Sequence, residues 1–247
     1  MSGRRERLAG LWWRTSWKWR ERYHRYGVEG LEHLLEPGAA LLVGYHGRPV
    51  AHDLCMLQIL LEERHGVVAH PIMHAAAAQT PVLRHAVSAM GMVTGDGPAL
   101  AEAVARGHKL MVTPGGTHEG CRPWTQRYRV DWGGRTGYVK LALKYRLPLV
   151  PAAGIGVDDT YVGLNDGDSW ARRLGAPAGL PVWLGVGPLG LWPLSPPFPV
   201  HIRTRIGPPL HSHLDHPVDP RDKAALAEVD GRVRAAVQAL LDEGRRA

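Results

Sequence analysis

Short apolar runs that alternate with helix-forming segments constrain this chain more than any other feature of its sequence. The clearest runs cover residues 39–45 and 109–113, and glycine-containing turns follow both. Runs of this length, bounded by turn residues and separated by segments with helical spacing of apolar residues, are typical of buried strands in an α/β fold. We therefore expect an α/β protein, a single domain with a largely parallel central sheet flanked by helices.

The remaining elements are expected to follow the same alternation. Further strands are predicted at 67–70, 147–154 and 200–206, and helices at 53–65, 75–90, 96–106 with Asp96 as its cap, 137–146 and 219–243. One segment departs from this pattern, because residues 174–200 contain seven prolines and no charged side chain. Proline forbids a continuous helix there, so an irregular apolar loop is expected.

The positive charge of the chain is concentrated at its start. The formal net charge is +7, and residues 1–26 hold eight Lys and Arg against two Glu. At helical spacing, one face of this segment would carry Leu8, Trp12, Trp19, Tyr23 and Tyr26. We expect residues 1–28 to form a basic aromatic amphipathic segment ahead of a domain at 29–247. Its aromatic face would bind a membrane surface, pack on its own domain or stack on nucleic acid.

We favour the membrane surface among these alternatives and expect no nucleic-acid partner. Residues 174–200 are a second candidate for membrane contact, although they could instead line an acyl-chain tunnel or cover the core. No run of about 20 apolar residues predicts a membrane-spanning helix, and no secretory signal is recognisable. We therefore expect a peripheral or monotopic protein at the cytoplasmic face of a membrane.

The cysteines and histidines give no signature of a metal site. Cys55 and Cys121 are the only cysteines, without the spacing of zinc or redox motifs, and the 14 histidines include no H-E-x-x-H pattern. We expect no bound metal. A metal-dependent hydrolase built on His46, His52, Asp53 and His70 is the hypothesis that a bound metal would support.

Two loops carry the residues that favour catalysis. His46, Arg48, His52 and Asp53 follow the first predicted strand, and the block Pro114-Gly115-Gly116-Thr117-His118-Glu119 follows a later one. In a parallel sheet both loops leave the same carboxyl edge, where such folds place their active sites. Histidine titrates near neutral pH and is suited to act as a general base.

Together these residues resemble the glycerolipid acyltransferases of the lysophospholipid acyltransferase superfamily, especially the branch near the monoacylglycerol and diacylglycerol acyltransferases. The family signature is a His followed closely by an Asp, a Pro-Gly-Gly-x-Arg-Glu or related block, a helix and a Pro-Leu-Val-Pro strand. The matching positions are, in this order, His46 with Asp53, residues 114–119, residues 137–145 and residues 148–151. The likeness covers about three quarters of the chain.

The resemblance implies a glycerol-3-phosphate acyltransferase-like fold and a membrane-associated enzyme. Such an enzyme transfers a fatty acyl group from acyl-CoA, or acyl carrier protein, to a hydroxyl of a glycerolipid or similar lipid acceptor. Acyl-CoA is then a co-substrate, and no cofactor is expected. The alternative is a non-catalytic lipid- or membrane-binding protein that retains the fold.

The resemblance also implies roles for individual residues. His46 would be the general base and Asp53 would orient its imidazole, while the backbone around Gly115 and Gly116 would bind the oxyanion. Arg48 and Thr117 would contact substrate. Glu119 would either contact substrate or accept N–H groups of its own turn.

Two departures from the family pattern leave parts of this assignment open. Six residues separate His46 from Asp53, whereas the family usually has four and sometimes five, so His52 is the alternative partner of Asp53. The family arginine of the glycine block is His118 here. Because arginine is the usual reader of phosphate, its loss favours a neutral acceptor, although Arg48, Arg122 or Arg127 could replace it.

Overall fold

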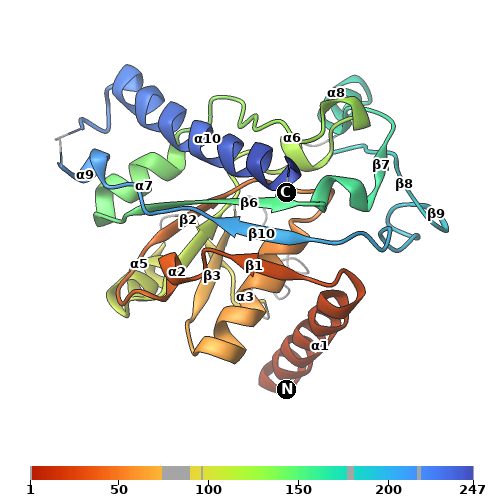
Figure 1. The fold of residues 1–247 in the computed structure, drawn as a ribbon, viewed down its shortest axis with the longest axis horizontal. Coiled ribbons are helices and arrows are strands. Elements are labelled where there is room, and N and C mark those ends of the chain that lie inside the picture. Colours follow the sequence, from red (N-terminus) through yellow and green to blue (C-terminus); the bar gives the residue numbers. More distant parts are fainter. Residues whose placement is uncertain (1, 74–89, 96, 177–180, 216–217, 247) are drawn as a thin grey trace.

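The central feature of the fold is a seven-stranded sheet with the strand order β1-β10-β6-β2-β5-β3-β4. The computed structural model describes residues 2–73, 90–95, 97–176, 181–215 and 218–246 (Figure 1). The helix predicted at 75–90 lies almost wholly outside these residues, and so does the predicted cap Asp96.

Five strands of this sheet run parallel to one another, as the alternation of apolar runs predicted. They are β6 (Leu149–Ile155), β2 (Leu41–Gly44), β5 (Lys109–Val112), β3 (Ala69–Met73) and β4 (Val93–Thr94). At the other edge, β10 (Arg203–Ile206) pairs antiparallel with β6 and parallel with β1 (Gly27–Glu29). The prediction of a single α/β domain with a largely parallel sheet is confirmed.

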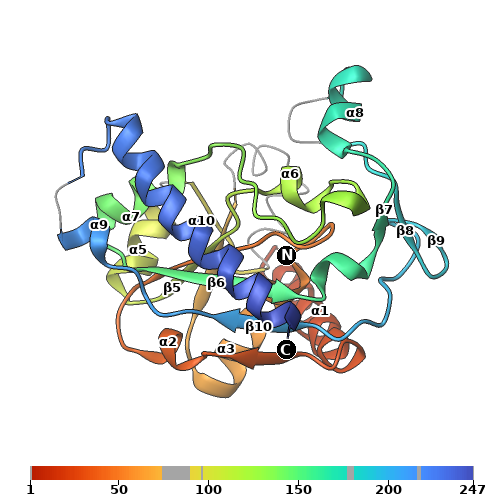
Figure 2. The same cartoon turned by 45° about the horizontal axis from the view of Figure 1, so that its top comes forward.

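Helices cover both faces of the sheet (Figures 1 and 2). The longer ones are α1 (Ser2–Tyr23), α3 (His52–His65), α5 (Pro98–Ala105), α7 (Gly137–Tyr145) and α10 (Lys223–Arg246). Short helices are α2 (Glu32–Leu35), α6 (Thr117–Gly120), α8 (Gly167–Arg173) and α9 (Ser212–Asp215), with 3-10 turns η2 (Trp124–Gln126) and η3 (Val157–Thr160).

Alternating side chains of the central strands build the two layers of the core. Leu41 and Val43 belong to the apolar cluster that includes Val233 and Val237 of α10. Leu42, between them, belongs to the opposite cluster with the leucines of α3. Because neighbouring residues of a strand point to opposite faces, a strand buried on both sides is apolar throughout, which is why the run at 39–45 identified it.

The long C-terminal helix begins later than predicted. The sequence placed its start at residue 219, but the amides of Ala224 and Ala225 donate to Asp222 Oδ1 at 2.8 and 3.1 Å. The side chain of Asp222 therefore caps the helix. Gly244 lies inside the helix rather than beyond its end. A Cβ at this position would approach the Ile155 side chain to 2.5 Å, so the close packing of the helix on β6 requires glycine here.

Helix α1 packs on α3 through a face that the sequence did not single out. Trp17 is buried there, whereas Trp12 and Trp19 of the predicted face are 68% and 57% exposed. Two cations also pair with α3, since Arg14 lies 2.6 Å from Glu62 and Lys18 lies 2.8 Å from Glu63. Self-packing therefore occurs on one side of α1, and the other side presents tryptophan outward.

The N-terminal helix is shorter than the segment expected at residues 1–28, and the division into this segment and a domain at 29–247 stays a prediction. Helix α1 ends at Tyr23, so Tyr26 lies beyond it and hydrogen-bonds through its hydroxyl to the Asp53 carbonyl at 3.1 Å. The expected boundary between residues 28 and 29 falls inside strand β1. None of the helices in the described ranges is both long enough and apolar enough to cross a membrane.

The proline-rich segment is not irregular throughout, which corrects the expectation of a loop. Strands β8 (Gly185–Gly187) and β9 (Gly190–Leu191) form a hairpin, and β8 also pairs with β7 (Val162–Gly163). Backbone pairing of this kind needs no helix and tolerates the neighbouring prolines, which lie outside the paired positions. Leu189 and Leu194 are 81% and 93% exposed at this hairpin, hereafter the β8–β9 hairpin.

The packing of α1 makes a testable prediction about stability. Trp17→Ala should lower the free energy of unfolding by about 3–5 kcal/mol, because it removes a buried aromatic side chain. Trp12→Ala on the exposed face is the matched control and should change it by less than about 0.5 kcal/mol. Urea denaturation of the full chain measures both, and equal effects would contradict this packing.

Candidate active site

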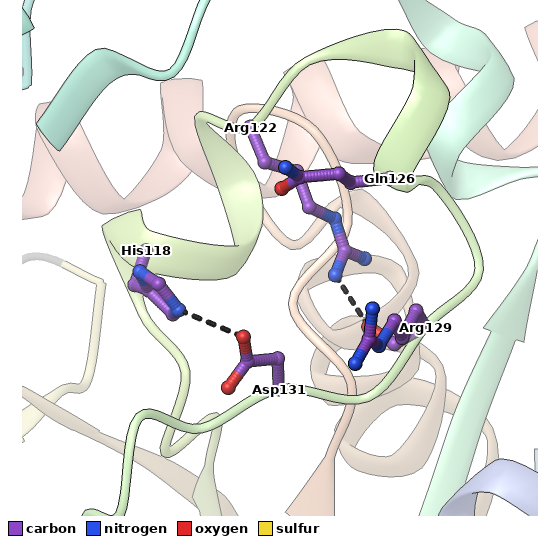
Figure 3. A pocket seen from close by; sticks show the side chains of 5 residues that line it. All are labelled: His118, Arg122, Gln126, Arg129 and Asp131. Atoms are coloured by element: carbon purple, nitrogen blue, oxygen red, sulfur yellow. Dashed lines mark hydrogen bonds and ion pairs between the residues drawn. The ribbon is translucent and has the colours of Figure 1, made fainter. Parts of the chain in front are cut away.

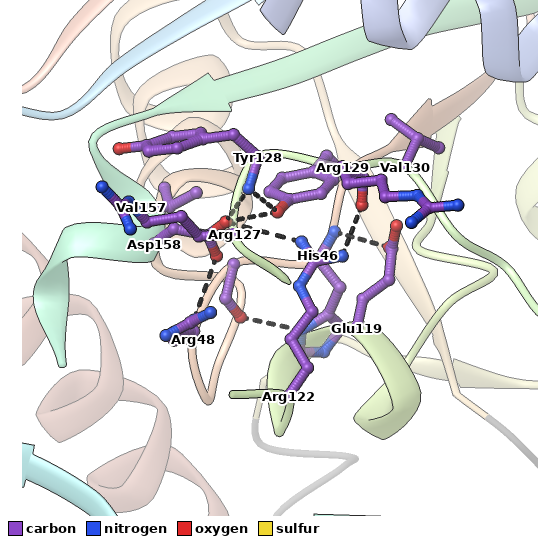
Figure 4. Close-up of polar contacts among 12 residues, drawn as sticks. His46, Arg48, Glu119, Arg122, Arg127, Tyr128, Arg129, Val130, Val157 and Asp158 are labelled. Carbon is purple, nitrogen blue, oxygen red and sulfur yellow. Dashed lines mark hydrogen bonds and ion pairs between the residues drawn. The ribbon is translucent and has the colours of Figure 1, made fainter. Parts of the chain in front are cut away.

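Glu119 joins the two loops that the sequence selected. It is fully buried on α6, and its Oε2 accepts the backbone N–H of His46 at 3.1 Å (Figure 4). Its Oε1 accepts the backbone N–H of Asp131 at 2.9 Å, which ties a third loop to the same carboxyl group. Burial raises the pKa of Glu119 well above its usual value. The amides that Glu119 accepts belong to two other loops, and both roles expected of it, in its own turn and on substrate, stay predictions.

The ring of His46 lies against α6 in a defined tautomer. Its Nδ1 is 2.8 Å from the carbonyl oxygen of Gly47, and since a carbonyl only accepts, Nδ1 carries the proton. Nε2 is then the basic nitrogen. Burial lowers the pKa of His46 below its usual value, so the ring is neutral at pH 7. A Cβ at Gly120 would lie 2.6 Å from Nδ1, so this close contact requires glycine.

Asp53 lies at the start of α3 with its side chain buried. Its Oδ1 has no hydrogen-bond partner, and among the described residues neither His46 nor His52 hydrogen-bonds to the carboxyl group. Burial raises the pKa of Asp53 to about 7. The predicted pairing of His46 with Asp53 therefore stays a prediction, and in this structure the Gly47 carbonyl orients the imidazole.

His52, the alternative partner, is enclosed by aromatic side chains. Its ring centroid lies 5.5 Å from that of Trp17 and 5.9 Å from that of His24. Burial lowers the pKa of His52 to about 3, so it stays neutral across the physiological range. Helix α1 thus forms a wall beside the first loop of the site.

The glycine block forms a tight turn at the carboxyl end of β5. Gly115 leaves room for the side chain of Glu119, which a Cβ would overlap. Gly116 has a φ of 51° and its amide donates to the Thr113 carbonyl at 3.0 Å. That amide is therefore occupied within the turn in this structure. The oxyanion and substrate roles expected of Gly115, Gly116 and Thr117 stay predictions.

Arg48 has partners inside the protein. Its guanidinium group is fully buried, with Nη2 donating to the Pro123 carbonyl at 2.8 Å and Nε 3.4 Å from Asp158 Oδ1. Arg122 Nη2 lies 3.4 Å from Oδ2 of the same aspartate (Figure 4). The Tyr45 hydroxyl donates a hydrogen bond to this oxygen as well. The buried guanidinium groups of Arg48 and Arg122 therefore share the carboxylate of Asp158. The contact of Arg48 with substrate stays a prediction.

Asp158 is the residue at this site that sequence reasoning missed. It lies in η3, directly after β6, where its negative charge raises the pKa of His46 against the larger effect of burial. The available signal was its position, because an acidic pair follows the predicted strand at the same carboxyl edge that carries His46. The motifs that carry the family resemblance do not include Asp158.

Cys121 lies next to α6 but is not arranged as a nucleophile. Burial raises the pKa of its thiol to about 12, which keeps it protonated at neutral pH. Across the described ranges, no group of three or more His, Cys, Asp or Glu side chains is arranged to hold a metal ion.

Comparison with known proteins identifies the family. The sequence model of the diacylglycerol acyltransferase family matches residues 2–186, so the chain belongs to this family. It is 26% identical over 245 residues to the bovine "DGAT1/2-independent enzyme synthesizing storage lipids", covering 99% of this chain and 66% of that protein. An uncharacterized protein of Mycobacterium bovis is 29% identical over 225 residues, covering 89% of this chain and 61% of the relative.

The chain therefore spans somewhat less than two thirds of the length of these relatives. Among solved structures, it resembles the 1-acyl-sn-glycerophosphate (LPA) acyltransferase PlsC from Thermotoga maritima, with a TM-score of 0.50 and 16% sequence identity. That match covers 95% of this chain and 79% of the other. At this identity the likeness shows the fold, and it confirms the predicted acyltransferase-like architecture.

Burial of Asp53 predicts a pH-dependent stability. Its pKa of about 7 exceeds the ordinary 3.8, so the folded state holds the proton more tightly and gains stability that is lost as pH rises through 7. Asp53→Asn has no such proton to lose. Between pH 5 and pH 8 the variant should therefore gain about 2–3 kcal/mol relative to the parent. Urea titrations at both pH values measure this, and a constant difference would contradict it.

Proposed function

We propose that this chain is a membrane-associated acyltransferase that moves a fatty acyl group from acyl-CoA, or acyl carrier protein, to a hydroxyl of a glycerolipid or similar lipid. The observation that carries this proposal is the position of His46. Its imidazole is neutral, has a defined tautomer and lies against Gly120, directly after the glycine block. Family membership supplies the reaction class.

In the proposed reaction, His46 Nε2 takes the proton of the acceptor hydroxyl as that oxygen attacks the thioester carbonyl. The carbonyl oxygen becomes an oxyanion beside the glycine turn at 114–116. When the intermediate collapses, the C–S bond breaks and the imidazolium returns the proton to the departing thiolate. The products are the acylated lipid and free coenzyme A, and no covalent enzyme intermediate is required.

A lipid acceptor requires the site to reach a membrane, and two surfaces support this proposal. The β8–β9 hairpin presents exposed leucines, and α1 presents Trp12 and Trp19 beside basic residues. The Tyr23 hydroxyl at the end of α1 donates to the Pro197 carbonyl at 2.8 Å, which connects the helix with the segment that carries the hairpin. Exposed leucine and tryptophan favour the bilayer interface.

His46→Ala tests the chemistry directly. Acceptor-dependent release of coenzyme A from palmitoyl-CoA, measured with liposomes that carry monoacylglycerol, diacylglycerol or lysophosphatidic acid, should fall about 10²- to 10⁴-fold. Because burial lowers the pKa of His46, the acidic limb of the kcat/KM profile should have its inflection below 6.5.

His65→Ala at the exposed end of α3 is the matched control and should retain the parent rate. Unchanged turnover in His46→Ala would remove the proposed base. An absence of acceptor-dependent release from the parent protein, with lipid binding intact, would favour the alternative of a non-catalytic lipid-binding protein.

The hairpin leucines test the proposed membrane contact. Replacement of Leu189, Leu191 and Leu194 by serine should reduce partitioning into liposomes at least about tenfold, because burial of each leucine contributes about 1.5–3 kcal/mol. Leu35→Ser on α2 is the control at another exposed leucine. Liposome flotation measures the bound fraction, and equal partitioning of both variants would rule out the hairpin as the contact.

A further inference from the structure

The segment of residues 128–131, between η2 and α7, contains no helix or strand and is held by side chains (Figure 4). At one end, the amide of Tyr128 donates to Asp158 Oδ2. At the other end, the amide of Asp131 donates to Glu119 Oε1 at 2.9 Å. Asp158 and Glu119 both belong to the candidate active site, so the 128–131 segment is joined to the site at both ends.

Tyr128 has a backbone conformation that its contacts must maintain. Its φ is 60°, in the left-handed region that residues other than glycine rarely adopt. Such a conformation persists where the surroundings over-determine it. The Tyr128 hydroxyl donates to Asp159, and the guanidinium carbon of Arg245 lies 4.5 Å from the ring centroid. If the contacts of its backbone were lost, relaxation to a negative φ would turn the amide away from Asp158.

The side of the segment that faces α6 is drawn in Figure 3, around a polar hollow of about 120 Å³. The Arg129 carbonyl accepts from Arg122 Nη1. The Asp131 carboxylate lies 3.2 Å from His118 Nε2. These two contacts attach the segment to α6 and to the residues that follow it.

A single glutamine of α10 binds two further backbone groups of the segment. Gln238 Oε1 accepts the amide of Val130 at 2.9 Å, and its Nε2 donates to the Tyr128 carbonyl at 3.2 Å. These partners require one orientation of the carboxamide, because an amide N–H only donates and a carbonyl only accepts. Asp242, one turn further along α10, accepts from the same Nε2 at 3.0 Å. Gln238 is therefore fixed from its own helix and presents a donor and an acceptor to the segment.

We propose that Gln238 is a positioning residue, which from α10 holds the 128–131 segment so that two of its amides stay on carboxyl groups of the active site. One of these groups, Glu119, also accepts the amide of His46. The other, Asp158, supplies negative charge that raises the pKa of His46 against the larger effect of burial. Gln238 thus acts on the orientation and the charge of the base through these two groups.

This inference deepens the proposed acyl transfer and rests on it for its kinetic readout. Helix α10 lies outside residues 2–186, the part of the chain that the family model matches. The family pattern therefore does not indicate a residue of this helix that supports the site.

Release of the segment has a predictable effect on the base. Burial raises the pKa of Asp158, while three arginines and the Tyr128 amide lower it; the arginines are Arg122, Arg48 and Arg127. Its carboxylate also interacts with Tyr45, Asp53 and Glu119. Without the Tyr128 amide, Asp158 would bind a proton more tightly and place less negative charge near His46. The pKa of His46 should then fall further below its usual value.

Gln238→Met tests this role, because methionine matches glutamine in length and helix propensity but lacks the carboxamide. In the assay with palmitoyl-CoA and acceptor liposomes, kcat should fall about tenfold or more, with KM changed less than about twofold. An NMR titration should show a lower pKa of the His46 ring than in the parent. Hydrogen exchange at the amides of Tyr128 and Val130 should be faster.

Val237→Ala is the matched control, since its fully buried side chain belongs to the apolar core. It should lower the stability to urea while kcat and the His46 titration stay at the parent values. Gln238→Asn keeps a carboxamide that is one methylene further from the segment, so its effects should be smaller than those of Gln238→Met.

Equal His46 titrations in Gln238→Met and Val237→Ala would overturn the positioning role. Faster amide exchange in Gln238→Met with the kcat of the parent would also overturn it, because the contact would then be structural only. If the parent protein shows no acceptor-dependent turnover, the acyl transfer fails, and the titration still decides the role of Gln238. The two proposals therefore fail separately.

Discussion

The geometry of the site depends on one buried carboxyl group. Glu119 accepts the amide of His46 on one oxygen and the amide of Asp131 on the other, so it connects the loops after β2 and η2 to helix α6. Removing it would leave two amides without this acceptor, at a cost of about 1–3 kcal/mol for each if both stayed buried. The same side chain explains Gly115, because a Cβ there would occupy its space. The glycine block and the histidine loop are thus one unit.

Within the histidine loop, the Gly47 carbonyl leaves Nε2 as the basic nitrogen of His46. In the expected arrangement a carboxylate holds the imidazole, but here the Gly47 carbonyl holds Nδ1. A neutral acceptor selects the same tautomer without placing a second charge beside the ring. It stabilises an imidazolium less than a carboxylate would, and Asp158 supplies the nearby negative charge that raises the pKa of His46. Orientation and charge therefore come from two different groups in this structure.

The sequence predicted what depends on local patterns and missed what depends on distant contacts. The apolar runs identified β2, β5 and β6, and the turn residues placed His46 and Glu119 at one edge. Helical periodicity could not show that Trp17 faces inward, since Trp12 and Trp19 fit an apolar face equally well. Asp158 was missed because its importance comes from Arg48 and Arg122, which lie far from it in the sequence.

Buried polar atoms without a hydrogen bond gather mainly in two groups of residues. Twelve such atoms are found in the described residues; six belong to the wall between α1 and the start of α3, namely Trp13 Nε1, Trp17 Nε1, Arg20 Nε, His24 Nε2, His52 Nδ1 and Asp53 Oδ1. Four more belong to Arg48, Arg122 and Asp158. Asp158 also raises the pKa of His46, against the larger effect of burial.

Burial without hydrogen bonds is costly for a folded chain, and proteins concentrate such costs where they act on other molecules. The two groups differ in character. The group between α1 and the start of α3 mixes N–H donors with one carboxyl oxygen, whereas the second group joins two guanidinium groups to one carboxylate.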